Sequence, residues 1–320
     1  MSVTGPRDPE ANFPLAAHTP PASQKSSSPQ APAKVTVLGI HARKRNRGGG
    51  ECKPITCLTA YDYPTARLVD EAGIDLVLVG DSLAMVVLGY ENTLPVTVDE
   101  MLHHTRAVRR AVRRALVIAD MPYGSYQLGD TEAVGNAARF IKDAGAEAVK
   151  IEGGAKRADL VRRMLDAEIP VMGHIGLTPQ SVHPMGGYKV QGRNLGAAEQ
   201  LVRDAIALDR AGIFSLVLEG IPTEVAGMIS SEISAPTIGI GAGPDCDGQV
   251  LVLHDILNLS FRAPAKFVRG YADAAALIRG AAEEFKRDVE SGSYPSQAES
   301  YHLPPELQTA MEMIAGRRRG

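Results

Sequence analysis

The sequence predicts an α/β protein built as a (β/α)8 barrel, with an extra C-terminal helix and a disordered N-terminal extension. Short apolar runs recur along the chain, and most are separated by segments with apolar residues at i, i+3 and i+4 spacing. There are eight runs, at 55–60, 75–81, 115–121, 148–154, 170–176, 215–221, 236–242 and 250–256. Eight strand–helix units in succession imply a parallel sheet, which closes naturally into a barrel.

The segments between the runs carry helix signals in the order that a barrel requires. Amphipathic spacing is clearest at 97–112, 131–145, 156–168 and 194–212. Gly73, Gly145 and Gly212 stand where helices are expected to end, as glycine commonly does. The connection between the seventh and eighth runs is short, so the last strand is the least well placed.

An open, doubly wound sheet is the alternative arrangement for the same alternation of strands and helices. The dinucleotide-binding form of that fold carries G-x-G-x-x-G after its first strand. The segment that follows residues 55–60 lacks this pattern, so the barrel is favoured.

Composition divides the chain into three regions. Residues 1–33 are rich in Pro, Ser and Ala and carry few large apolar groups, so we expect them to be disordered. Residues 34–294 are expected to form the catalytic barrel domain, including a last amphipathic helix at about 272–291. Residues 295–320 are expected to be a polar tail, which ends in three arginines and a glycine.

Charge and cysteine content restrict the partners and the compartment. The formal net charge of −3 among 320 residues gives no argument for a nucleic-acid or acidic-membrane partner. No apolar run approaches the roughly 20 residues that span a bilayer. The three cysteines are an odd number without a CxxC pair, which favours a reducing compartment. We therefore expect a cytoplasmic protein with no nucleic-acid or membrane partner.

Polar residues stand at the carboxyl ends of most apolar runs. In chain order they are Thr59, Tyr61, Asp62, Asp81, Ser82, Asp120, Lys150, Glu152, His174 and Glu219. Any one of them could be an ordinary strand-end residue that caps a helix or pairs with a neighbour. In a barrel, however, these ends converge on one mouth, where the active site lies. Several carboxylates gathered there would repel one another without a cation.

The residue types at these strand ends favour a hard metal ion and 2-oxo-acid chemistry. Four carboxylates without a Cys/His cluster suit Mg²⁺ better than zinc. Such an ion polarises a carbonyl group, and a nearby carboxylate can then remove an α-proton. The ammonium group of Lys150 would neutralise a substrate carboxylate.

Longer motifs carry a resemblance to a known family. They are TAYDYPTARLVDEAG, LVGDSLAMVVLGYENTLPVT, AVKIEGG, GHIGLTPQSV with GGYKVQGR, and IGIGAGPDCDGQVLVLHD. The chain resembles the ketopantoate (3-methyl-2-oxobutanoate) hydroxymethyltransferases over roughly residues 54–294. The resemblance implies a Mg²⁺-dependent barrel that transfers a one-carbon unit from 5,10-methylenetetrahydrofolate to 3-methyl-2-oxobutanoate. The product is 2-dehydropantoate, on the route to pantothenate and coenzyme A, and family members are typically homodecamers.

The same resemblance implies roles for individual residues. It implies metal ligation by Asp81, Asp120 and Glu152, and a general base at Glu219. It implies substrate contacts by Asp81, Ser82, Asp120, Lys150 and His174, of which Ser82 and Lys150 hold the substrate carboxylate. It says nothing about the N-terminal extension.

Two other functions remain open at this stage. A Mg²⁺-dependent carbon–carbon lyase of the phosphoenolpyruvate mutase/isocitrate lyase type would share the barrel and the 2-oxo acid. Such lyases use a cysteine acid on a mobile loop, and no matching cysteine motif is present. A non-catalytic barrel should have lost some of the converging polar groups. The glycine-rich segment 238–243 could hold a phosphate, although a tight loop explains it as well.

Overall fold

The structure is a computed structural model that describes residues 33–44 and 53–317. The predicted N-terminal extension therefore lies almost entirely outside the described residues. The chain divides into two compact units, one up to Ala272 and one from Asp273.

The first unit is a closed barrel of eight parallel strands in sequential order, which confirms the predicted fold class. Strand β8 pairs with β1 and closes the ring. The strands are β1 (Ile55–Thr59), β2 (Leu76–Val79), β3 (Leu116–Asp120), β4 (Ala148–Glu152), β5 (Val171–Gly176), β6 (Ser215–Glu219), β7 (Thr237–Ile240) and β8 (Gly248–Leu251). Each lies within or beside a predicted run.

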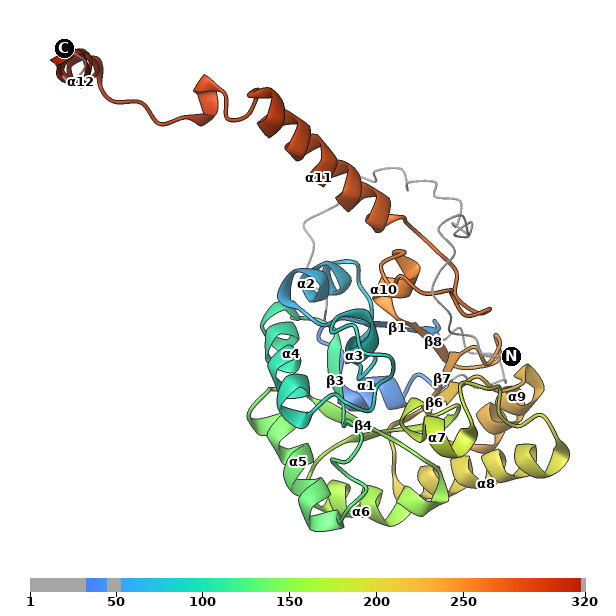
Figure 1. Ribbon diagram of the computed structural model, residues 1–320. Coiled ribbons are helices and arrows are strands. Elements are labelled where there is room, and N and C mark those ends of the chain that lie inside the picture. The colour runs from blue at the N-terminus through green and yellow to red at the C-terminus, as the bar shows by residue number, and fades with distance from the viewer. Residues whose placement is uncertain (1–32, 45–52, 318–320) are drawn as a thin grey trace, which may run out of the picture. The chain divides into compact units, whose positions relative to one another are not determined.

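Helices follow one another around the outside of the strands (Figure 1). Those of the first unit are α1 (Val37–His41), α2 (Tyr63–Glu71), α3 (Leu83–Val86), α4 (Val98–Ala111), α5 (Asp130–Lys142), α6 (Ala158–Asp166), α7 (Val182–Met185), α8 (Leu195–Ala211), α9 (Thr223–Glu232) and α10 (Leu253–Ile256), with 3₁₀ turns η1 (Ala155–Arg157) and η2 (Pro179–Ser181). As expected, α8 ends at Gly212, whose φ of 99° is left-handed and favours glycine.

Alternate residues of each strand point into the barrel, and those at its amino-terminal end are apolar. Ile55, Leu76, Leu116 and Ile238 belong to one buried cluster together with Ile40 of α1. Ile40 is completely buried. Helix α1 therefore closes the amino-terminal end of the barrel, and the opposite end remains for the site.

The predicted eighth run was placed too late in the chain. Strand β8 covers residues 248–251, and residues 253–256 form α10 instead. The register explains the difference, because Gly248 pairs with Ile55 at the start of β1. A Cβ atom at position 248 would lie 2.4 Å from the carbonyl oxygen of Ile55, so this close approach requires glycine. No apolar pattern marks such a strand start.

The second unit contains α11 (Ala274–Ser291), the 3₁₀ turn η3 (Gln297–Glu299) and α12 (Pro305–Arg317). Helix α11 confirms the predicted last amphipathic helix. Helix α12 lies in the segment that was expected to be a polar tail. None of the helices in the described part of the chain is long and apolar enough to cross a membrane.

Candidate active site

Strand parity places the predicted charged residues on the inside of the barrel. Ile118, Ala148, Met172 and Val217 line the interior. Side chains two positions further along a strand share the same face. The inward positions that follow are Asp120 on β3, Lys150 and then Glu152 on β4, His174 on β5, and Glu219 on β6. The apolar interior thus ends in a charged layer at the carboxyl ends of the strands.

Asp81, Asp120 and Lys150 form the first part of this layer, and all three are at most 4% exposed. The backbone N–H of Asp81 donates to Oδ2 of Asp120 at 3.0 Å. Oδ1 of Asp120 lies 3.2 Å from Nζ of Lys150. One ammonium group therefore faces two buried aspartates, which leaves negative charge uncompensated.

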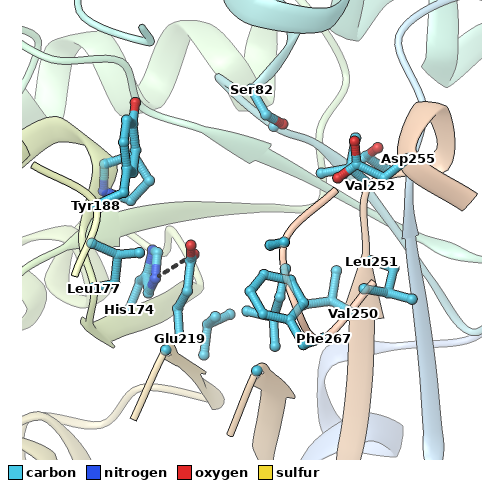
Figure 2. Close-up of a pocket in the computed structure, with 18 of the residues that line it drawn as sticks. Ser82, His174, Leu177, Tyr188, Glu219, Val250, Leu251, Val252, Asp255 and Phe267 are labelled. Atoms are coloured by element: carbon cyan, nitrogen blue, oxygen red, sulfur yellow. Dashed lines mark ion pairs between the residues drawn. The ribbon is translucent and has the colours of Figure 1, made fainter. Parts of the chain in front are cut away.

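His174 joins the two glutamates of the layer. Its Nδ1 lies 3.3 Å from Oε1 of Glu152 and its Nε2 lies 3.2 Å from Oε2 of Glu219. Figure 2 shows the second contact, with Glu219 rising from β6 toward the imidazole. The side chain of Glu219 is 16% exposed, against 3% for Glu152. Glu219 is thus the more accessible carboxylate to a ligand in the pocket.

Burial and mutual repulsion shift the ionisation of this layer. Burial raises the pKa of Asp81 to about 8, and the charges of Asp120 and Glu152 add to the shift. Burial and the Lys150 ammonium oppose protonation of His174, but its contacts with Glu152 and Glu219 outweigh them and raise its pKa to about 9. Burial likewise opposes the charge of Lys150, yet the carboxylates of Asp120, Glu152 and Asp81 hold its pKa above the usual value. Lys150 and His174 are therefore both positively charged at neutral pH.

All seven predicted site residues line one pocket of about 740 Å³. Ser82 lies at the start of α3, where its Oγ is 2.8 Å from the hydroxyl of Tyr61. Tyr188 and Lys189 from the quoted motif GGYKVQGR also line the pocket. Val250, Leu251, Val252 and Phe267 form an apolar wall across from Glu219 (Figure 2). The cavity is far larger than a five-carbon acid needs, so a second, partly apolar ligand has room beside it.

The glycine-rich segment 238–243 comprises the end of β7 and a closely packed turn after Ile240. A Cβ atom at Gly241 would lie 2.5 Å from the ring of Phe267, and one at Gly243 would lie 2.0 Å from Oγ1 of Thr223. These contacts favour the tight-loop interpretation over a phosphate cradle.

Two residues of the site escaped the sequence reasoning. Gln180 donates from Nε2 to Oδ2 of Asp81, and Tyr126 donates to the amide oxygen of Gln180. Gln180 belongs to the quoted motif GHIGLTPQSV, and its position just after the fifth strand was the available signal. An amide beside a strand end has no charge to mark it, so it was overlooked.

The donor set fits a hard cation. Among the described residues, no three or more His, Cys, Asp or Glu side chains form a ready-made ligand cluster. Mg²⁺ does not need one, since it typically takes one or two carboxylates and completes its shell with water and substrate oxygens. Oδ1 of Asp120 is buried and faces the Lys150 ammonium group at 3.2 Å without a regular hydrogen bond, and this one lysine faces the buried carboxylates of both Asp81 and Asp120. A divalent cation would give Oδ1 of Asp120 a further partner and would supply the positive charge that these carboxylates lack.

A closed parallel barrel with its charged residues gathered at the carboxyl ends of the strands is the architecture of (β/α)8-barrel enzymes. The ketopantoate hydroxymethyltransferase profile matches residues 34–297. The chain belongs to this family, which confirms the family and the enzyme class predicted from the motifs.

Individual relatives agree with the family match. The 3-methyl-2-oxobutanoate hydroxymethyltransferase of Koribacter versatilis (strain Ellin345) is 73% identical over 265 residues, which cover 83% of this chain and 90% of the relative. The enzyme of the same name from Geobacter sulfurreducens is 56% identical over 266 residues, covering 83% of this chain and 98% of the relative.

Among solved structures, the chain is similar to 2,3-dimethylmalate lyase, a member of the phosphoenolpyruvate mutase/isocitrate lyase superfamily. The TM-score is 0.54 at 18% identity, covering 90% of this chain and 100% of the lyase. At this identity the likeness shows the fold alone. The lyase alternative expects a cysteine that acts as an acid. The described residues that line the pocket include no cysteine, so the pocket does not support that alternative.

Proposed function

We propose that this chain transfers a one-carbon unit from 5,10-methylenetetrahydrofolate to 3-methyl-2-oxobutanoate, giving 2-dehydropantoate. Family membership supports the reaction, and the pocket supports its chemistry. The observation that carries the mechanism is the position of Glu219, an accessible carboxylate held by His174 beside the buried layer of Asp81, Asp120 and Lys150.

Asp81, Asp120 and Glu152 would hold Mg²⁺. Glu152 is the weakest of the three candidates, because Oε1 faces His174 and Oε2 accepts from the backbone N–H of Gln180. When bound, the ion supplies positive charge that stabilises negative charge developing on the keto oxygen of the substrate.

The remaining roles fall to charged and hydroxyl side chains of this chain. The ammonium group of Lys150 and the hydroxyl group of Ser82 would bind the substrate carboxylate. Glu219 would accept the C3 proton at a carboxylate oxygen. Protonated His174 keeps Glu219 oriented through its Nε2. As the C3–H bond breaks, its electron pair forms the C2–C3 double bond, and the π pair of the carbonyl group moves onto the keto oxygen to give the enolate. C3 of the enolate would then bond to the one-carbon unit, water would supply the hydroxyl oxygen, and tetrahydrofolate would leave.

Enolisation provides a test of Glu219 that needs no folate. In D₂O with Mg²⁺ and 3-methyl-2-oxobutanoate, the protein should exchange the C3 hydrogen for deuterium, measured by NMR. Glu219→Gln should slow this exchange by about 10²–10⁴-fold, the scale of a positioned base. Substrate affinity should stay close to that of the unchanged chain.

Glu224→Gln is the matched control, because Glu224 is an exposed glutamate on α9 that does not line the pocket. This variant should exchange at the original rate. Full exchange in Glu219→Gln would remove Glu219 from the mechanism. Product analysis after addition of methylenetetrahydrofolate tests the overall reaction, and absence of 2-dehydropantoate would refute it.

We also propose that the protein works in the cytoplasm as a homodecamer, without nucleic-acid or membrane partners. The described cysteines Cys57 and Cys246 are buried, and the sequence has three cysteines with no CxxC pair, which suits a reducing compartment. Sedimentation equilibrium should give ten times the chain mass of 34.0 kDa, and a monomeric mass would contradict the assembly.

A further inference from the structure

Gln180 occupies a buried position directly beside the proposed metal site. It lies in η2, just after β5, and is 6% exposed. Its side-chain nitrogen Nε2 donates to Oδ2 of Asp81 at 2.9 Å and to the backbone oxygen of Met121 at 2.9 Å. Its Oε1 accepts from the hydroxyl of Tyr126 at 2.6 Å and from Nε2 of Gln127 at 3.1 Å. The amide thus makes four hydrogen bonds.

These partners determine which way the amide points. The Met121 carbonyl and the ionised Asp81 carboxylate offer only acceptor oxygens, whereas Tyr126 and Gln127 both donate. Turning the amide over would set its oxygen against a carboxylate and a carbonyl, and would leave its NH₂ group facing donors. Only the observed orientation satisfies all four bonds, so Tyr126 and Gln127 direct the NH₂ group toward Asp81.

The same residue also holds a second carboxylate of the site. The backbone N–H of Gln180 donates to Oε2 of Glu152 at 3.0 Å, and the backbone N–H of Glu152 donates to the hydroxyl of Tyr126 at 3.0 Å. Gln180 and Tyr126 therefore connect Asp81 on one side of the site with Glu152 on the other. A neutral donor suits this position beside Asp81. A lysine or arginine here would itself supply the positive charge that the metal cation is proposed to bring.

We propose that Gln180 is a positioning residue for the metal site, which holds the Asp81 carboxylate through Oδ2 and so presents it to the divalent cation. The inference rests on the proposed metal role of Asp81 and Asp120. Hydrogen-bonding partners behind a metal ligand orient that ligand, and their loss typically lowers metal affinity or activity about 10–100-fold. Tyr126 acts one step further back, by fixing the direction of the Gln180 amide.

Direct metal binding tests this role without relying on turnover. Mn²⁺, which also takes oxygen ligands, is titrated into the full chain with 3-methyl-2-oxobutanoate present, and free Mn²⁺ is measured by electron paramagnetic resonance. Gln180→Met keeps a side chain of similar size and removes all four amide bonds. It should raise the Kd for Mn²⁺ by about 10–100-fold. Tyr126→Phe should weaken binding less, because Gln127 still holds the amide oxygen.

A buried polar control separates positioning from general loss of stability. Thr237→Val removes hydrogen bonds of a completely buried threonine to Ser230 and Asp247, away from the pocket. Thermal unfolding in EDTA measures the stability of each variant. The proposal expects Thr237→Val to keep the original Kd even where its melting temperature falls as far as that of Gln180→Met.

Three results would overturn the proposal in distinguishable ways. An unchanged Kd in Gln180→Met would show that the amide does not position Asp81, while the metal site itself stands. Equal weakening in Thr237→Val would assign the effect to stability. Absence of Mn²⁺ binding by the unchanged chain would remove the metal site and the role of Gln180 together.

Discussion

Asp120 and Asp247 lie at opposite ends of the barrel, are both 3% exposed, and have contrasting surroundings. Asp247 precedes β8 at the amino-terminal end. Its Oδ2 accepts from Nζ of Lys44 at 2.9 Å, from the backbone N–H of Thr237 at 2.7 Å and from the hydroxyl of Thr237 at 3.0 Å. Asp120 at the mouth shares one lysine with other carboxylates, and its Oδ1 faces that lysine at 3.2 Å without a regular hydrogen bond.

The aspartates that precede and follow β2 repeat this contrast. Asp75, at the amino-terminal end, is paired with Arg43 and Arg114 and accepts hydrogen bonds from Thr56. Burial would raise its pKa, but these partners outweigh burial and lower it. Asp81, only six positions later, has its pKa raised to about 8. Residue type and burial therefore do not distinguish these aspartates, whereas the balance of donors around the carboxylate separates Asp75 and Asp247 from the proposed metal ligands Asp81 and Asp120.

The sharpest test of this contrast applies the same substitution at both ends. Asp120→Asn should raise the Mg²⁺ concentration needed for half-maximal activity by about 10²-fold or more, because a ligand charge is lost. Asp247→Asn should leave that Mg²⁺ requirement unchanged. Activity measured over a Mg²⁺ titration gives both values, and an unchanged requirement in Asp120→Asn would remove it from the metal site.

Stability should respond in the opposite order. Asp247→Asn leaves the ammonium group of Lys44 without its carboxylate and should lower the free energy of unfolding by about 3 kcal/mol. Asp120→Asn should cost less in the metal-free chain, since it removes a like charge beside Asp81. Urea unfolding in EDTA compares the two variants. Equal losses at the two ends would break the distinction between them.

The pH dependence of stability gives a further test of this contrast, centred on Asp81. A carboxyl group whose pKa is raised from 3.8 to about 8 by folding binds more protons folded than unfolded between these values. Its contribution therefore makes the metal-free chain less stable as pH rises from about 4 to about 8. Asp75, with a lowered pKa, loses its stabilising contribution only as pH falls below about 4.

Unfolding in EDTA across this pH range measures the effect. Asp81→Asn should flatten the decline and be more stable than the unchanged chain near pH 8, while Mg²⁺ should stabilise only the unchanged chain. A decline of the same slope in Asp81→Asn would assign the pH dependence to other groups.

The sequence by itself determined the fold class and the family, and it predicted seven site residues that the structure brings to one pocket. Local signals suffice for this, because apolar runs mark buried strands and the carboxyl ends of parallel strands must meet at one mouth. The motifs around Asp81, Lys150 and His174 identified the family that the profile and the relatives then showed.

Only the tertiary structure decided how these residues are connected. The start of β8 at Gly248 depends on how closely the backbone approaches Ile55, which leaves no apolar pattern in the sequence. Gln180 reaches Asp81 across 99 positions of the chain, and its role depends on Tyr126 and Gln127 turning its amide. Asp75 and Asp81 look alike in sequence, and the opposite shifts of their pKa values arise from burial, donors and charges that folding brings from distant segments.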